Sequence, residues 1–92
     1  MFLQKNIDKN PFHGHKRGYI EIVAQILALC LRGECKENIP CRANLNFPQA
    51  EKYINEMQLR KLIRIEGEKY FKTEKGELVL DLYTELNKAL MG

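Results

Sequence analysis

Apolar residues recur along the chain at intervals that predict four helices and one pair of strands. From Tyr19 to Leu31 nearly every position is apolar, and the polar stripe is limited to Glu21, Gln25 and Arg32. This pattern predicts a helix that is buried on more than one side. A chain of this length has little core with which to cover such a helix, so a second subunit is the simplest cover.

The segment from Asn44 to Ile65 predicts a second long helix that runs directly into a strand. Asn46 and Gln49 have the spacing of a capping box, and Pro48 falls in the first turn. The apolar stripe of this helix consists of Phe47, Ala50, Ile54 and Met57. Its polar face carries Gln49, Lys52, Tyr53 and Glu56. Such a face suits a major groove, where an amide pairs with adenine and Lys52 contacts a phosphate or guanine.

A β-hairpin is predicted immediately after this helix. Leu62, Ile63 and Ile65 form the first strand, Glu66-Gly67-Glu68 is a tight turn, and Tyr70–Thr73 is the returning strand. From the helix alone, an ordinary amphipathic helix with a solvated polar face is the favoured interpretation. The helix-then-hairpin order favours the second half of a winged helix-turn-helix.

The connection between the two long helices completes that motif. Gly33 is predicted to end the first helix at its C′ position. Asn38 is a candidate N-cap for a short helix with Pro40 in its first turn, and residues 44–46 form the turn that follows. Arg42, on the short helix, is placed to touch a phosphate. This is the helix-turn-helix order.

A last helix is predicted over residues 74–91, with Thr73 as its N-cap. Its apolar stripe either folds back on the domain or pairs with the same helix of a second chain. The residues expected at such a dimer interface are Val79, Leu82, Tyr83, Leu86 and Leu90. The predicted fold class is α+β and mostly helical, a winged helix-turn-helix with a C-terminal helix after the wing.

Residues 1–16 are predicted to form a basic N-terminal arm, and residues 17–92 the single domain. The sequence here is basic apart from Asp8, through Lys5, Lys9, His13, His15, Lys16 and the adjoining Arg17. Such an arm suits a phosphate backbone or a minor groove. A frayed terminus is the alternative interpretation.

The overall charge adds little to this picture. The 92 residues carry a formal charge of +3, which is compatible with DNA binding but does not argue strongly for it. The longest apolar run, Ile26 to Leu31, is too short to span a bilayer, and the first residues lack the pattern of a signal peptide. We therefore expect a cytoplasmic protein without a membrane partner.

The sequence contains no constellation that suggests catalysis. Serine is absent, and no glycine-rich phosphate loop is present. Cys30, Cys35 and Cys41 do not have the spacing of a C-x-x-C metal site, although His13 and His15 would complete a zinc set on paper. A disulfide between two of them stays open if the source is a hyperthermophile. We predict no enzyme, no metal, no cofactor and no small-molecule substrate.

Between Arg17 and Leu90 the chain contains, in this order, the segments R-G-Y-I-E-I-V-A-Q-I-L, A-N-L-N-F, K-Y-I-N-E-M, L-I-R-I and Y-F-K-T-E-K-G. In these segments it resembles the small archaeal winged-helix DNA-binding proteins. These are the ArnR-like transcriptional regulators and the related dimeric chromatin-associated proteins. The resemblance implies a homodimer on double-stranded DNA, with Asn46 at the recognition-helix cap. It places Tyr70, Thr73 and Gly76 in structural roles where the wing meets the last helix.

Two features depart from that family. The last helix is short, which favours a compact dimer, and the wing tip Glu66-Gly67-Glu68 is acidic, which Lys69 and Lys72 partly offset. The leading hypothesis is a sequence-selective transcriptional regulator that acts as a homodimer. The alternatives are an architectural chromatin-type protein and a winged helix used for protein–protein contact. The predicted DNA-binding residues are Arg42, Asn46, Gln49, Lys52, Tyr53, Lys69 and Lys72.

Overall fold

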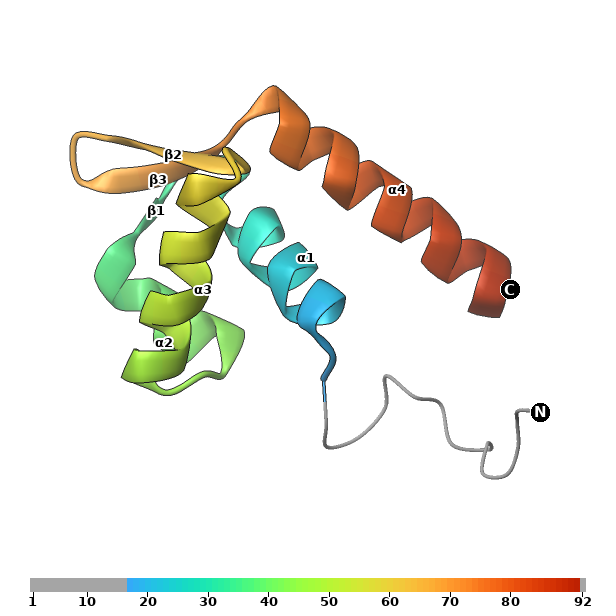
Figure 1. The fold of residues 1–92 in the computed structure, drawn as a ribbon, viewed down its shortest axis with the longest axis horizontal. Coiled ribbons are helices and arrows are strands. Elements are labelled where there is room, and N and C mark those ends of the chain that lie inside the picture. The colour runs from blue at the N-terminus through green and yellow to red at the C-terminus, as the bar shows by residue number, and fades with distance from the viewer. Residues whose placement is uncertain (1–16, 92) are drawn as a thin grey trace.

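The computed structural model describes residues 17–91, so the predicted N-terminal arm lies outside the described residues. The elements are α1 (Tyr19–Leu29), β1 (Glu34–Cys35), the 3-10 turn η1 (Lys36–Asn38), α2 (Ile39–Ala43), α3 (Phe47–Leu59), β2 (Ile63–Glu66), β3 (Lys69–Lys72) and α4 (Glu74–Met91). Figure 1 shows α1 at the centre, with α2 and α3 on one side, α4 on the other and the sheet at one end. This order confirms the predicted winged helix-turn-helix with a C-terminal helix.

The core is built around α1. Its apolar residues from Ile22 to Leu27 are buried, and they pack with side chains of α2 and α3. The largest fully buried side chains are Ile26, Leu27, Ile39, Ile54, Met57 and Cys30. Ile20 and Leu31 stay about half exposed, at 51% and 47%. The chain itself therefore supplies most of the cover that we expected from a second subunit.

The first helix ends earlier than predicted, so the assignment of Gly33 to its C′ position is wrong. The helix ends at Leu29 and Cys30 is its C-cap. Gly33 lies three residues beyond that cap with φ +95°, and a Cβ there would come within 2.7 Å of the Phe71 ring. The glycine is needed because the chain turns tightly beneath this ring to enter β1.

The turn into α3 follows the predicted chemistry. Asn44 is in the left-handed region with φ 57°, a conformation that asparagine tolerates better than most residues. The capping box is confirmed: the Gln49 N–H donates to Asn46 Oδ1 at 2.8 Å, and the Asn46 N–H donates to Gln49 Oε1 at 3.3 Å. Asn38 stands at the N-cap of α2, but its side chain makes no capping bond, because the preceding 3-10 turn already gives it helical dihedrals.

The apolar stripe of α3 is confirmed at three positions and wrong at the fourth. Ala50, Ile54 and Met57 are buried, whereas Phe47 is 69% exposed. Phe47 is the first residue of the helix and lies at the edge of the stripe, where it lines an open groove beside α2 instead of the core.

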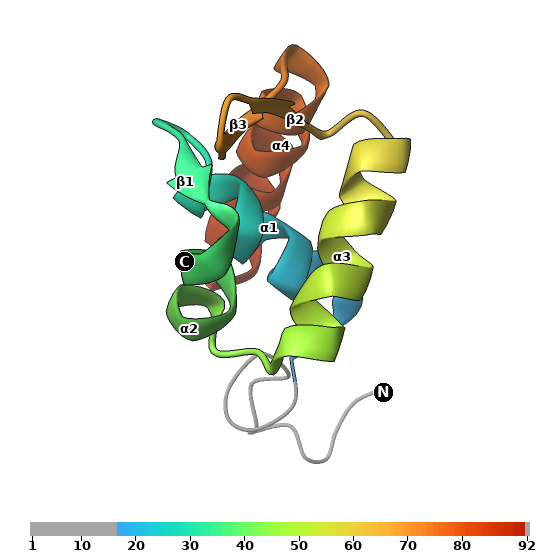
Figure 2. The ribbon, with the colours of Figure 1, turned by 90° about the vertical axis from the view of Figure 1, so that its left-hand side faces the viewer.

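The sheet contains the predicted hairpin and one additional strand. β2 and β3 pair in antiparallel fashion, with Ile63 opposite Lys72 and Glu66 opposite Lys69. Gly67, the first residue of the two-residue turn, has φ +64°, as a type II′ hairpin requires. β1 adds to the other edge of β3, giving the order β1-β3-β2. Figure 2 shows how this strand brings the wing beside the start of α2.

The wing and α4 pack closely against each other at their junction. The Gly76 N–H donates to Thr73 Oγ1 at 3.0 Å, which confirms Thr73 as the N-cap. The Thr73 hydroxyl also donates to the carbonyl of Lys61 at 2.6 Å. Gly76 is buried, and a Cβ at this position would collide with the carbonyl oxygen of Leu62 and lie 2.9 Å from Leu27 Cδ2. Only glycine allows α4 to approach the wing and α1 this closely.

We expect Gly76→Ala to destabilise the fold by about 1–3 kcal/mol, because the methyl group meets backbone that cannot move aside. Alanine is otherwise the better helix former by about 1 kcal/mol, so helix propensity alone would stabilise the variant. A measured loss of stability would therefore come from the collision. Urea unfolding followed by circular dichroism measures the change. Asp81→Ala, at an exposed position of the same helix, is the control. A Gly76→Ala protein as stable as this control would contradict the tight-packing argument.

Candidate nucleic-acid interface

The face of α3 that points away from the core carries a small set of polar groups. Lys52, Asn55 and Leu59 recur at spacings of three and four residues and therefore share one side of the helix. All three are exposed, Leu59 to 82%, and they line a shallow groove with Glu56 and Arg60.

Asn55 at the centre of this face was missed in the sequence analysis. The signal was its spacing of three residues from Lys52, which puts the two side chains side by side. Its amide makes no hydrogen bond among residues 17–91 and has a free donor and a free acceptor, the pattern that pairs with an adenine edge. Gln49 lies at the margin of the same face. Its Oε1 is occupied by the capping box, which leaves its NH₂ group as a donor.

Tyr53 was predicted on the DNA side, and the structure places it at the edge of that face. It is half-buried and packs against the core. Its ring lies 5.6 Å from the ring of Tyr19, with an interplanar angle of 31°. Such a tilted aromatic pair joins α3 to the start of α1.

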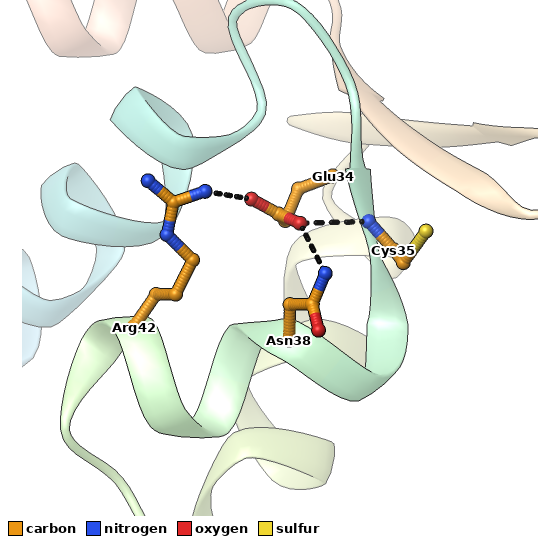
Figure 3. Close-up of polar contacts among 4 residues, drawn as sticks. All are labelled: Glu34, Cys35, Asn38 and Arg42. Carbon is orange, nitrogen blue, oxygen red and sulfur yellow. Dashed lines mark hydrogen bonds and ion pairs between the residues drawn. The ribbon is translucent and has the colours of Figure 1, made fainter.

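Arg42, predicted to contact a phosphate, is held by a buried carboxylate. Figure 3 shows Glu34 as the centre of a polar cluster: it accepts from Arg42 Nη1 at 2.7 Å, from Asn38 Nδ2 at 2.9 Å and from the Cys35 N–H at 3.1 Å. The Glu34 side chain is 8% exposed, whereas that of Arg42 is 60% exposed. The guanidinium thus reaches solvent, but its charge is largely balanced by Glu34.

The cluster keeps Glu34 ionised. The hydrogen bond from Asn38 and the positive charge of Arg42 hold the pKa of Glu34 below its usual range, although burial acts in the opposite direction. Burial, with a smaller contribution from the Glu34 charge, raises the pKa of Cys30 to about 12. Cys30 is therefore a protonated core thiol. Because Glu34 belongs to β1, Asn38 to η1 and Arg42 to α2, the cluster fixes these three elements to one another.

The wing carries both free and paired cations. Lys69, exposed beside the turn, makes no ion pair among residues 17–91, whereas Lys72 pairs with Glu77 of α4 at 3.0 Å. Arg64 pairs with Glu66 at 2.9 Å and lies over the Phe71 ring at 5.3 Å. Of the two predicted wing contacts, Lys69 is thus the available one.

One residue of the predicted basic surface has a structural role. Arg17 donates from Nη1 to the carbonyl of Ala43 and from Nη2 to the carbonyl of Asn44, both at 2.6 Å. It also contacts Gln25 Oε1. Because these carbonyls end α2, the guanidinium caps that helix and joins it to α1.

A second candidate surface lies on α4. Four leucines spaced four residues apart, which we call the α4 leucine row, are 56–65% exposed: Leu78, Leu82, Leu86 and Leu90. Of the predicted dimer residues, Val79 and Tyr83 are half-buried, and Val79 packs against the domain's own core. Burial and the nearby charge of Glu21 raise the pKa of Tyr83. The leucine row therefore lies beside the face that α4 packs on α1.

Residues 17–91 contain no group of three or more metal-ligating side chains, and Cys30, Cys35 and Cys41 are free thiols. Within the same residues no helix has the length and apolarity to cross a membrane.

Comparison with known proteins agrees with this geometry. A family model described as winged helix-turn-helix matches residues 16–91. Among solved structures, the chain is similar to the crystal structure of Sso10a-2, a DNA-binding protein from Sulfolobus solfataricus, with 28% sequence identity and a TM-score of 0.68 over 79% of this chain and 81% of that chain. A search of curated proteins gave no match. The resemblance to small archaeal winged-helix DNA-binding proteins is confirmed.

The Glu34 cluster predicts a pH-dependent stability. A carboxyl whose pKa is lowered by folding stabilises the protein above its unfolded pKa of about 4.3, and this contribution is lost as the pH falls through the folded pKa. We therefore expect Glu34→Gln to be less stable than the wild type at neutral pH, and the difference to shrink towards about pH 3. Urea unfolding at both pH values measures it, with the exposed Glu74→Gln as control. A difference that is the same at both pH values would contradict the lowered pKa.

Proposed function

Because the chain belongs to the winged helix-turn-helix family, we propose that it binds double-stranded DNA with α3 in the major groove. The observation that carries the proposal is the exposed pair of Lys52 and Asn55 at the centre of α3, with the NH₂ group of Gln49 beside them. These groups combine a cation for phosphate or guanine with amides for adenine. Lys69 on the wing supplies a second cation for the adjacent backbone.

The similar protein Sso10a-2, described as a DNA-binding protein, supports this proposal independently of the geometry of α3. Its identity of 28% extends over about four fifths of both chains. The proposal involves no chemistry on the DNA. The protein acts by occupying its site.

We further propose that two chains form a homodimer through the α4 leucine row. Four leucines spaced four residues apart span about 18 Å of helix, and a monomer that leaves them in water loses the stabilisation that their burial provides. A two-fold dimer presents two copies of α3, which reach successive major grooves when they are about 34 Å apart. This arrangement suits a sequence-selective transcriptional regulator.

An architectural chromatin-type protein is the second candidate. Such a protein depends on many phosphate contacts. Arg42 and Lys72 are each paired with a carboxylate of the same chain and are therefore less available for such contacts, which argues against this candidate. The ratio of specific to non-specific affinity separates the two candidates. For the third candidate, a winged helix used for protein–protein contact, the affinity for DNA would not depend steeply on salt concentration.

We expect substitutions on α3 to separate base readout from phosphate contact. Asn55→Ala removes an amide whose donor and acceptor are both free, so it should weaken binding to the preferred site by about 1–3 kcal/mol and leave binding to a scrambled duplex unchanged. Gln49→Ala removes a single NH₂ donor and should weaken binding to the preferred site less. Lys52→Ala should weaken binding to both duplexes and lower the salt slope by about 1. Fluorescence anisotropy on the two duplexes across a salt series measures all three.

Lys88→Ala, on α4 and remote from α3, is the matched control for loss of one positive charge. Equal losses on both duplexes for Asn55→Ala and Gln49→Ala would contradict direct readout. No binding by the wild-type protein at low salt would refute the DNA-binding proposal itself.

We expect Leu82→Asp combined with Leu86→Asp to convert the dimer into a monomer, because two charges in an apolar interface lose their hydration. The two recognition helices then bind independently, so affinity for a two-site duplex should fall strongly. Sedimentation equilibrium measures the mass. Ile65→Asp, a similarly exposed apolar residue on the wing at 52%, is the control. A wild-type chain that sediments as a monomer would contradict the proposal.

A further inference from the structure

A second groove lies on the other side of α3, between that helix, α2 and the tip of the wing. Its apolar part is formed by Pro40, Phe47, Ala50 and Ile54, and its volume is about 400 Å³. Phe47 is 69% exposed there, although a phenylalanine gains more than almost any other side chain from burial. The groove therefore has the apolar surface of a binding site.

The rim of this groove is acidic. Glu37 of η1, Glu51 of α3 and Glu68 of the wing turn all line it. The cation on the rim, Lys36, lies 3.3 Å from Glu51 and balances it, whereas Glu37 and Glu68 make no ion pair among residues 17–91. Because these carboxylates carry the same negative charge as phosphate, they repel it, and this side of α3 does not suit a DNA backbone. It suits an apolar side chain with positive charges on either side.

The chain enters the domain close to this groove. Arg17, the first described residue, is bonded to the carbonyls of Ala43 and Asn44 at the end of α2. Pro40 of the groove lies at the beginning of the same helix, and five helical residues span only about 7.5 Å. Ile7 stands ten residues before Arg17, and ten extended residues span up to about 35 Å, so Ile7 can reach the groove.

The composition of residues 1–16 matches the groove. The segment contains three lysines and a single aspartate, and Lys5 and Lys9 stand two residues before and after Ile7. An isoleucine between two lysines is complementary to an apolar floor between two unpaired carboxylates. Ion pairs at an exposed rim contribute little energy individually, so burial of Ile7 against Phe47 provides the affinity and the charges set the register.

We propose that the groove between α2, α3 and the wing binds the N-terminal segment of the same chain, with Ile7 against Phe47 and with Lys5 and Lys9 beside Glu37 and Glu68. The segment thereby covers the exposed Phe47 and neutralises the acidic rim. It lies beside the recognition helix without covering Lys52 and Asn55, which are on the other side of α3.

Paramagnetic relaxation in the full-length protein tests this contact. A nitroxide is attached at Asn6→Cys in a chain that also carries Cys35→Ala and Cys41→Ala, since Cys30 is buried and does not react. We expect strong broadening of the amide signals of Phe47 and Ala50. Lys5→Glu with Lys9→Glu should reduce it several-fold, and adding Glu37→Lys with Glu68→Lys should restore it. Asp81→Lys with Glu85→Lys, on α4, should not restore it.

Two results would overturn the proposal. Broadening that is the same in all four proteins would show proximity through the tether alone. Broadening of equal strength in a mixture of isotope-labelled chains without nitroxide and unlabelled chains with it would assign the groove to the segment of a second copy. The measurement contains no DNA, so either result leaves the proposed DNA binding untouched.

Discussion

The burial of α1 is the constraint on which the rest of the structure depends. Its side chains from Ile22 to Leu27 are apolar on three sides, so no single neighbour can cover them. The helix-turn-helix covers one side and α4 another, and the second cover is possible only because Gly76 lets α4 come against Leu62 and Leu27. The orientation of α3, and hence of its exposed face, follows from this central packing.

Pairing of charges decides which cations remain available to a partner. Arg42, Lys72 and Lys36 each lie beside a carboxylate of the same chain, and Arg17 caps a helix. These side chains hold elements together, which reduces their attraction for phosphate. Of the formal charge of +3, residues 1–16 carry +2, from three lysines and one aspartate, so residues 17–92 carry only +1. DNA binding by the described domain therefore depends on where its unpaired lysines lie more than on total charge.

The sequence predicted the elements well because local chemistry determines them. The Asn46–Gln49 capping box, the Thr73 cap and the hairpin each depend on residues close together in the chain. The features that were not predicted depend on residues further apart in the chain. The two residues of β1 pair only because β3 lies beside them. Gly33 is required by the nearby ring of Phe71, and Arg42 is held by Glu34, eight residues away. Phe47 was wrongly assigned to the buried stripe because periodicity shows on which side of a helix a residue lies, but not how far along that side the neighbouring elements extend.

The two sides of α3 therefore have different physical characters, and this difference limits how the helix can be used. One side presents a lysine and an amide with no partner among the described residues, and the other presents a phenylalanine between carboxylates. Phosphates of a duplex on the first side would be repelled by Glu51 and Glu68 wherever they came near the groove. Since electrostatic repulsion acts over about 8–10 Å at moderate salt, a cationic segment in the groove would reduce this repulsion. The acidic groove and the reading face are thus coupled through charge.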